Sequence, residues 1–288
     1  IVEIRFDCLL PGELTPAVTA VSGTDLGKPV IATFRSPDQG GHGSASLAER
    51  VEFWRNLPNG FEPRDVEADV ARTMSELPNG IVSFHDFSGV PENISSVYEN
   101  LSSLGEIVKI AVQADDAADA IPLWKLIERA SADGKKLIPV AMGDAGKWTR
   151  ILGLSHGAYL TYASLESGFE TAPGQITVTD LLGTYRAKEL NSDTTVFAVL
   201  GDPIAQSLSP YMHNPAFVAT GMNAVFLPLL IKDIGNFFRR MVRTESREVE
   251  LNFGGFSVTM PHKQSIMPFL DAIDPTAASE TKIVSRST

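Results

Sequence analysis

The hydrophobic residues of this chain follow two alternating patterns. Short β-branched or apolar runs predict strands, and the segments between them place apolar residues three or four positions apart, as amphipathic helices do. The predicted strands are Ile1–Arg5, Val30–Phe34, Asp65–Glu67, Ile81–Phe84, Ile107–Val112, Leu137–Ala141 and Ala158–Tyr162. The helical stripes are Leu47, Val51 and Trp54, then Ile94, Val97, Tyr98, Leu101 and Leu104, then Ile121, Trp124 and Ile127. This rhythm indicates an α/β fold with parallel strands and helical crossovers.

The strand count favours a (β/α)₈ TIM barrel over residues 1–190. Seven strands are predicted before Gln175, and a closed barrel of this kind has eight, so we expect one strand ahead of Ile1. Thr177 is predicted to cap a helix that runs to about Leu190. The polar segment Asn191–Thr194 then serves as a linker, and a second α/β region starts with Val196–Leu200.

Composition narrows the class of protein. Hydrophobic residues make up 43% and charged residues 20%, as in globular domains. The net charge of -11 argues against nucleic acid or an anionic membrane as the main partner. The single cysteine, Cys8, excludes an intrachain disulfide and a multi-cysteine metal site, so no metal ligands are assigned. The best apolar run, Val225–Ile231, is too short for a membrane helix and contains Pro228. We expect a cytoplasmic protein, or a plastid protein if a targeting segment has been removed.

Charged residues lie inside several apolar strands, where burial is costly unless they are paired or used. Lys109 lies within Ile107–Val112, and desolvation there favours the neutral amine that attacks a ketone. His85 ends the preceding strand and is a candidate general base. A lone histidine is more often structural, but Lys109 on the next strand favours catalysis. For Glu3 and Arg5, on one face of their strand, a structural ion pair is an equal alternative.

Together these segments resemble type I 3-dehydroquinate dehydratases, from Ile1 to about Arg186. The matching segments are Glu3–Arg5, Thr33–Ser36, Asp65–Glu67, Ser83–Phe87, Val108–Ala111, Met142–Arg150 and Thr171–Gln175. The resemblance implies that Lys109 forms an imine with the C3 ketone of 3-dehydroquinate. It implies that His85 removes the C2 proton and then protonates the leaving hydroxyl. It also implies that Arg150 binds the substrate carboxylate and that five residues surround the substrate hydroxyls: Glu3, Arg5, Arg35, Thr171 and Gln175.

One position departs from this family's pattern. Gln39 stands where the family usually has a glutamate that partners the catalytic histidine. A neutral amide stabilises an imidazolium less well than a carboxylate does. We therefore expect an altered pKa of His85 unless Asp38 or Asp65 compensates.

The second region, residues 194–288, carries two motifs at helix starts. Gly201–Pro210 follows a strand and opens a helix, with Ser209 as the predicted cap, Pro210 in the first turn and Gly221 past the end. The segments Gly201–Pro210 and Gly255–Lys263 resemble those of shikimate dehydrogenases. The resemblance implies that Ser207 and Ser209 hold the substrate carboxylate, that Thr259 contacts the substrate, and that Lys263 is the catalytic lysine.

The same resemblance implies NADP as the cofactor of the second region and none for the first. Up to about residue 277 the region looks like a substrate-binding domain, but no glycine-rich dinucleotide turn follows. The last residues instead resemble the NADP-selecting loop, with Ser285, Arg286 and Ser287 as cofactor contacts. We therefore expect only a fragment of a Rossmann domain, with residues missing near Ala277–Glu280 and after Thr288.

The main hypothesis is a bifunctional enzyme that forms 3-dehydroshikimate from 3-dehydroquinate and reduces it to shikimate. 3-Dehydroquinate, 3-dehydroshikimate and shikimate are the expected small-molecule partners. A homo-oligomer is also compatible with this hypothesis. A ligand-sensing regulator of the quinate pathway resembles the same two regions, although Lys109, His85 and Lys263 argue for catalysis. A quinate dehydrogenase is the third alternative, against which Ser207 and Ser209 argue only weakly.

Overall fold

The computed structural model describes residues 1–74 and 80–275, which fall into two compact units. The first unit comprises Ile1–Asp86, Glu92–Ala111 and Ala130–Ile138. The second comprises Phe87–Pro91, Val112–Arg129 and the described residues from Pro139 onward. The division runs through two strands of the N-terminal sheet rather than along the predicted linker Asn191–Thr194, which forms a turn.

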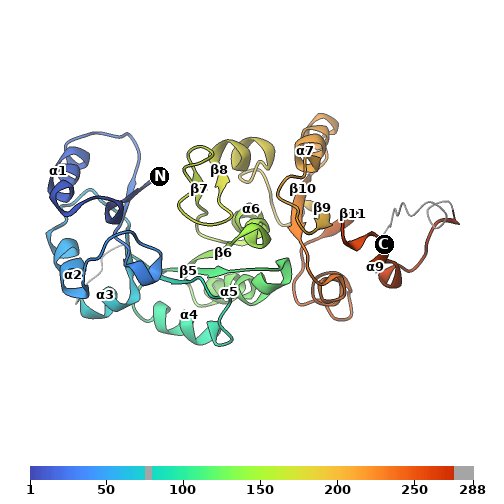
Figure 1. Ribbon diagram of the computed structural model, residues 1–288, viewed down its shortest axis with the longest axis horizontal. Helices are drawn as coiled ribbons and strands as arrows, with labels where there is room; N and C mark the ends of the chain where they lie inside the picture. Colours follow the sequence, from blue (N-terminus) through green and yellow to red (C-terminus); the bar gives the residue numbers. More distant parts are fainter. Residues whose placement is uncertain (75–79, 276–288) are drawn as a thin grey trace. The chain divides into compact units, whose positions relative to one another are not determined.

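The first unit is built on a parallel sheet whose strands follow one another in chain order. Figure 1 shows the last two of these strands, in green, side by side. The strands are β1 (Val2–Arg5), β2 (Val30–Thr33), β3 (Arg64–Glu67), β4 (Ile81–Asp86), β5 (Ile107–Gln113) and β6 (Lys136–Met142). The pairs β1–β2, β2–β3 and β3–β4 are parallel. These six strands confirm the first six predicted from the apolar runs. Their order also makes neighbours of the three strands that carry Asp65, His85 and Lys109.

The helices that accompany these strands bury the predicted apolar stripes. They are α1 (Pro11–Ser22), α2 (Leu47–Asn56), α3 (Ala68–Thr73), α4 (Ile94–Ser102) and α5 (Ile121–Ala132). The buried stripe residues are Val51 and Trp54 on α2, Ile94, Tyr98 and Leu101 on α4, and Ile121, Trp124 and Ile127 on α5. Helix α2 starts with a capping box in which Ser46 and Glu49 each accept from the other's backbone. Only Leu47 of its stripe is exposed.

The seventh predicted strand, Ala158–Tyr162, is wrong. After α6 (Lys147–Leu152) the chain forms a 3₁₀ turn, and Gly157 reverses it with a φ of +100°. The N–H of Ala158 then donates to the carbonyl of Gly153, 2.9 Å away, as a helix end does. Two short strands follow instead, β7 (Ala163–Ser164) and β8 (Ile176–Thr177), and among the described residues each pairs only with the other.

A closed eight-stranded barrel is not seen in the described residues, because the six-stranded sheet ends at β1 and β6. Thr177 does cap a helix, since its Oγ1 accepts from the N–H of Asp180 at 3.1 Å. This helix stops at Thr184 and not near Leu190. Arg186 has a φ of +50°, a left-handed conformation that ends a helix.

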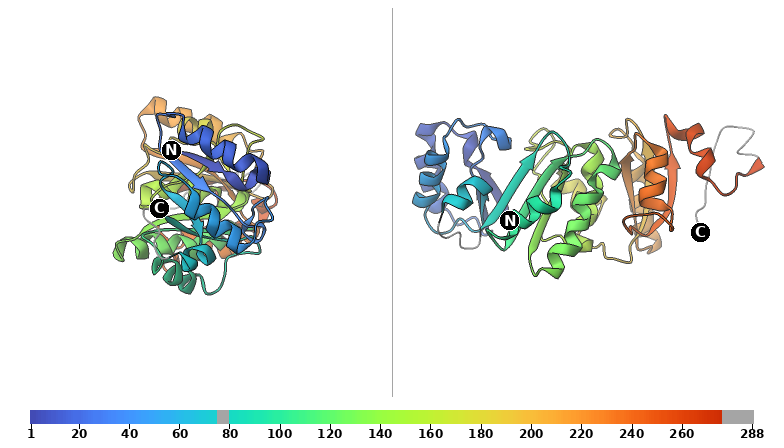
Figure 2. Two further views of the ribbon diagram at one scale, coloured as in Figure 1. Left: turned by 90° about the vertical axis from the view of Figure 1, so that its left-hand side faces the viewer. Right: turned by 90° about the horizontal axis from the view of Figure 1, so that it is seen from below.

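The C-terminal region forms a separate three-stranded sheet (Figure 2). Its strands are β9 (Thr195–Gly201), β10 (Ala224–Leu230) and β11 (Phe253–Val258), in the order β10–β9–β11, with both pairs parallel. Its helices are α7 (Ser209–Thr220), α8 (Ile234–Phe237) and α9 (His262–Ser265). Gly221 ends α7 with a φ of +68°, as predicted. Ser209 is the first helical residue rather than the cap, which is Leu208. No described helix has the length and apolar character that crossing a bilayer requires.

Candidate active site

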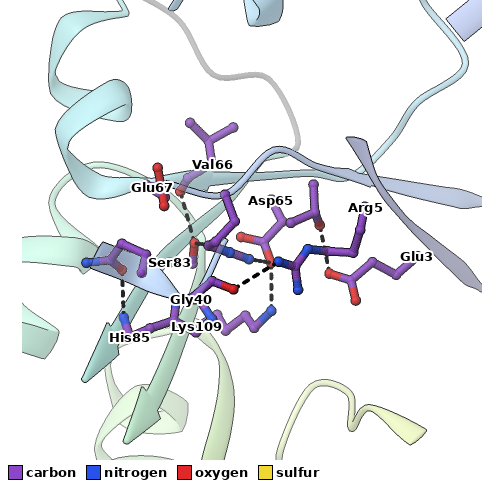
Figure 3. A network of polar contacts seen from close by, with 12 residues as sticks. Glu3, Arg5, Gly40, Asp65, Val66, Glu67, Ser83, His85 and Lys109 are labelled. Carbon is purple, nitrogen blue, oxygen red and sulfur yellow. Dashed lines mark hydrogen bonds and ion pairs between the residues drawn. The ribbon is translucent and has the colours of Figure 1, made fainter. Parts of the chain in front are cut away.

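A buried carboxylate at the centre of the first unit holds two cations. Asp65 on β3 is fully buried, and its Oδ2 accepts from Arg35 Nη2 at 2.8 Å and from Lys109 Nζ at 2.7 Å (Figure 3). Burial opposes the ionisation of Asp65, but Arg35 and Lys109 outweigh it and hold the pKa of this carboxyl far below its usual range. We call Arg35, Asp65 and Lys109 the Asp65 triad. Lys109, the lysine that lies within an apolar strand, is therefore paired with a buried carboxylate.

His85, near the end of β4, faces the positive charge of this triad. Its burial, together with the charges of Arg35 and Lys109, holds the pKa of the imidazole well below its usual range, and the charge of Asp65 opposes this. The ring is therefore neutral at neutral pH, as a general base must be. Its Nδ1 is buried without a hydrogen-bond partner among the described residues.

Gln39 contacts the backbone of His85 and not its ring. The Oε1 of Gln39 accepts from the His85 N–H at 2.8 Å (Figure 3). Gln39 lies in a tight turn, residues 36–41, directly after Arg35; we call it the Ser36 turn. Arg5 donates to the carbonyl of Gly40 in this turn at 3.2 Å. An amide at position 39 thus orients the histidine's strand but supplies no negative charge to the ring.

Glu3 and Arg5 do not pair with each other. Thr33 Oγ1 donates to Glu3 Oε1 at 2.7 Å, and Arg5 forms a two-pronged pair with Asp7 at 2.8 and 2.7 Å. Arg5 retains its charge, because its bond to Asp7 outweighs the effect of burial and raises the pKa of the guanidinium. The ion pair of Glu3 with Arg5, the alternative to a binding role, is therefore not formed, and Arg5 pairs with Asp7 instead.

Arg150, Thr171 and Gln175 lie in the second unit, and each makes a hydrogen bond within or to the loop from Thr171 to Gln175. Arg150 is 1% exposed, and its Nη2 donates to the carbonyl of Pro173 at 3.4 Å. Its Nε is buried without a partner among the described residues, and burial lowers the pKa of this guanidinium to about 10. Gln175 Oε1 accepts from the N–H of Thr171 at 2.8 Å. Arg150 thus offers a buried positive charge that no carboxylate in the described chain neutralises.

The loop from Thr171 to Gln175 is fixed to the end of β6 through a close contact. Gly143 N donates to the carbonyl of Pro173 at 3.1 Å. Gly174, with a φ of +69°, lies so near that a Cβ on it would be 2.1 Å from the carbonyl oxygen of Gly143. Only glycine fits there.

In the C-terminal sheet, the predicted residues follow the carboxyl ends of two adjacent strands. The Thr259 N–H donates to the carbonyl of Leu200 at 2.9 Å, which joins the end of β11 to that of β9. From β9 the chain leads to Ser207 and Ser209, both partly exposed, and from β11 to Lys263, which is exposed on α9. Such an edge of a parallel sheet commonly binds ligands.

Helix α9 is held in place by the neighbour of Lys263. His262 is buried, and its Nε2 lies 2.5 Å from the carbonyl oxygen of Ile231, just after β10. The predicted cofactor contacts Ser285, Arg286 and Ser287 lie outside the described residues.

The buried charged residues that the sequence analysis did not single out include Glu67 and Arg50. Glu67 at the end of β3 and Arg50 on α2 form an ion pair, and Glu67 Oε1 also accepts from Ser36. The rule that identified Lys109, a charge within a strand, applies equally to Glu67. No spacing rule identifies Arg50, because it lies on a helix where charged residues are ordinary.

Two family models cover most of the chain. The model of type I 3-dehydroquinase matches residues 1–192, and that of the shikimate dehydrogenase substrate binding domain matches residues 199–281.

Curated relatives carry both names. A bifunctional 3-dehydroquinate dehydratase/shikimate dehydrogenase of Arabidopsis thaliana, named as chloroplastic, is 32% identical over 97% of this chain and 46% of its own length. A 3-dehydroquinate dehydratase of Methanothermobacter thermautotrophicus is 33% identical over 62% of this chain and 80% of its own. The chain thus spans about half the length of the bifunctional relatives it matches.

Solved structures agree in fold. The dehydroquinate dehydratase and shikimate dehydrogenase of S. pombe AroM has a TM-score of 0.56 at 23% identity, over 98% of this chain and 56% of that chain. A 3-dehydroquinate dehydratase of Geobacillus kaustophilus has a TM-score of 0.55 at 27% identity, over 62% of this chain and 76% of that chain.

The electrostatics of His85 generate a prediction for Gln39→Glu. A carboxylate at position 39, beside the His85 backbone, adds a negative charge that favours the imidazolium, so the pKa of His85 should rise. The measurement is an NMR titration of the His85 ring. Gln39→Ala, which removes the amide without adding charge, is the control and should not raise the midpoint. An unchanged midpoint in Gln39→Glu would show that position 39 does not act on the ring.

Proposed function

The chain belongs to the type I 3-dehydroquinase family, and we propose that it dehydrates 3-dehydroquinate to 3-dehydroshikimate through an imine on Lys109. The observation that carries this proposal is a buried lysine on β5 beside a neutral histidine on the adjacent strand β4. A lysine within an apolar strand is costly to bury, and a covalent role explains its presence.

The proposed reaction uses the two side chains in sequence. The Lys109 amine attacks the C3 ketone and expels water, which leaves an imine. His85 takes the C2 proton, and the electron pair moves into the imine to give an enamine. The enamine returns the pair as the C1 hydroxyl leaves, protonated by His85, and hydrolysis of the imine frees the product and Lys109. The net change is the loss of one water from the substrate.

The charges of the triad and of Arg150 suit an anionic, hydroxylated substrate. Lys109 must lose its proton before its amine attacks the ketone. Arg150, buried and lacking a carboxylate partner in the described chain, is the proposed ligand of the substrate carboxylate. Glu3, Arg5, Arg35, Thr171 and Gln175 are the proposed hydroxyl contacts. Closure of the six-stranded sheet into a full barrel is part of the same proposal, supported by the family match.

Borohydride trapping tests the imine. Incubation with 3-dehydroquinate and borohydride should add one reduced ligand to Lys109, because reduction makes the C–N bond permanent. Peptide mass spectrometry locates the adduct. Lys109→Ala should abolish labelling, and Lys28→Ala, which removes an exposed lysine, should not change it. Equal labelling of Lys109→Ala would refute the assignment. A ligand-sensing regulator would bind without forming the adduct.

For residues 194–288 we propose a substrate-binding domain that takes shikimate and 3-dehydroshikimate, with the domain boundary at the turn Asn191–Thr194. The two family matches, which end at residue 192 and begin at residue 199, support this boundary. Ser207 and Ser209 are the proposed carboxylate ligands, Thr259 a further contact, and Lys263 the group at the reacting ketone. NADP is proposed from the resemblance alone, since its expected contacts lie outside the described residues. Location in the cytoplasm or in a plastid is a prediction from the sequence, and so is a homo-oligomeric state.

Kinetics separate the roles of these residues. Ser207→Ala with Ser209→Ala should raise the Michaelis constant for shikimate roughly tenfold or more, because hydrogen bonds to the carboxylate act on ground and transition states alike. Lys263→Ala should instead lower turnover, roughly a hundredfold, because its contact strengthens as charge develops on oxygen. The measurement is steady-state kinetics of both activities, with quinate as the competing substrate. Loss of dehydratase turnover in Lys263→Ala would contradict two separate sites.

A further inference from the structure

The Ser36 turn carries Gln39 to His85, and its position depends on a residue outside the proposed chemistry. The turn is closed by its own backbone: Gln39 N and Gly41 N both donate to the carbonyl of Ser36, at 3.1 and 2.8 Å. It is also tightly packed against Arg35, since a Cβ on Gly41 would lie 1.9 Å from the Arg35 carbonyl oxygen. Ser36 is therefore the point at which the turn is fixed to the rest of the unit.

Glu67 supplies that attachment. Its Oε1 accepts from both the N–H and the Oγ of Ser36, at 2.9 and 2.8 Å. Glu67 and Ser36 are 2% and 4% exposed, so water does not compete for these bonds. The other oxygen of Glu67 accepts from Arg50 on α2, which also donates to Asp69 at 2.6 Å. The carboxylate thus connects the sheet, the turn and a helix.

Side-chain packing alone does not hold the turn on this side. A cavity of about 290 Å³ lies against it, and its lining includes Asp38, Gln39, Glu67 and Ser83. This space leaves room for the turn to shift if the bonds to Ser36 are lost. A buried ion pair such as Glu67–Arg50 adds little net stability compared with an apolar pair of the same size, so its value lies in fixing geometry.

We propose that Glu67 is a positioning residue for the dehydration: through Ser36 it fixes the turn that sets Arg35 against Asp65 and Gln39 against the His85 backbone. The inference rests on the proposed dehydratase function. Glu67 acts on the step that His85 performs, the transfer of the C2 proton, where misplacement by about 1 Å can slow the reaction roughly a hundredfold.

The test compares Glu67→Ala with Glu67→Gln. Alanine removes the acceptor for Ser36, and turnover should fall roughly tenfold to a hundredfold. Glutamine keeps an Oε1 that accepts from Ser36 while losing the charge, so it should retain most turnover even if it unfolds at a lower temperature. A substrate deuterated at C2 should show a larger isotope effect on turnover in Glu67→Ala, because proton transfer becomes slower.

Ser36→Ala and Ser36→Thr provide the second comparison, in case Glu67→Ala fails to fold. Threonine keeps the Oγ donor and should preserve turnover, whereas alanine should lower it severalfold. Asp69→Asn, which changes the partly exposed second partner of Arg50 but not the turn, is the matched control and should leave turnover unchanged.

Borohydride trapping separates failure of this inference from failure of the proposed function. If the parent protein forms no adduct on Lys109, the proposed function fails. If the adduct forms in every variant and turnover falls as described, the positioning role is supported. If the adduct forms but folded Glu67→Ala or Ser36→Ala keeps the parent's turnover and isotope effect, the positioning role is wrong. Equal losses in Glu67→Gln and Glu67→Ala would also overturn it, because the charge and not the acceptor would then matter.

Discussion

The first unit depends on one buried carboxylate, that of Asp65. Arg35 and Lys109 are both almost fully buried, and each would be an uncompensated charge without it. Two cations around one anion leave a net positive charge inside the sheet. Burial together with that charge keeps His85 neutral, and in the proposed reaction the charge also attracts the anionic substrate. In the proposed function, a single electrostatic arrangement therefore prepares both the base and the binding of the substrate.

The parallel sheet brings these residues together from short segments of the sequence. Because β2, β3, β4 and β5 are consecutive neighbours, residues in or just after these strands meet although they lie far apart in the chain. Arg35 follows β2, Asp65 lies in β3, His85 in β4 and Lys109 in β5. The buried Glu67 then fixes the turn that begins at Ser36, so the charged network extends one layer outward to α2. In the C-terminal sheet, too, the candidate residues come from adjacent parallel strands, in the segments that follow β9 and β11.

The sequence predicted the elements whose signal is local. Apolar runs located β1–β6 to within a few residues, and Gly221 marked the end of α7. Lys109 was recognisable because a charge within an apolar strand is costly. The strand predicted at Ala158–Tyr162 failed because an apolar run cannot reveal the turn at Gly157. The Asp65 triad was not predictable either, because Arg35 and Lys109 lie 30 and 44 positions from Asp65 in the sequence and meet it only through tertiary packing. Likewise, the contact of Gln39 with backbone rather than ring depends on the path of the Ser36 turn.

The most direct test of the Asp65 triad is the pH dependence of its contribution to stability. The pKa of Asp65 is far lower in the folded protein than in the unfolded chain, so its stabilisation is present above about pH 4 and declines as the pH falls. Urea unfolding of the parent and of Asp65→Asn should therefore differ by about 3–5 kcal/mol at pH 7. Below about pH 4 this difference should shrink by about 1.4 kcal/mol per pH unit. A difference that is small at pH 7, or that stays constant down to pH 3, would contradict the account.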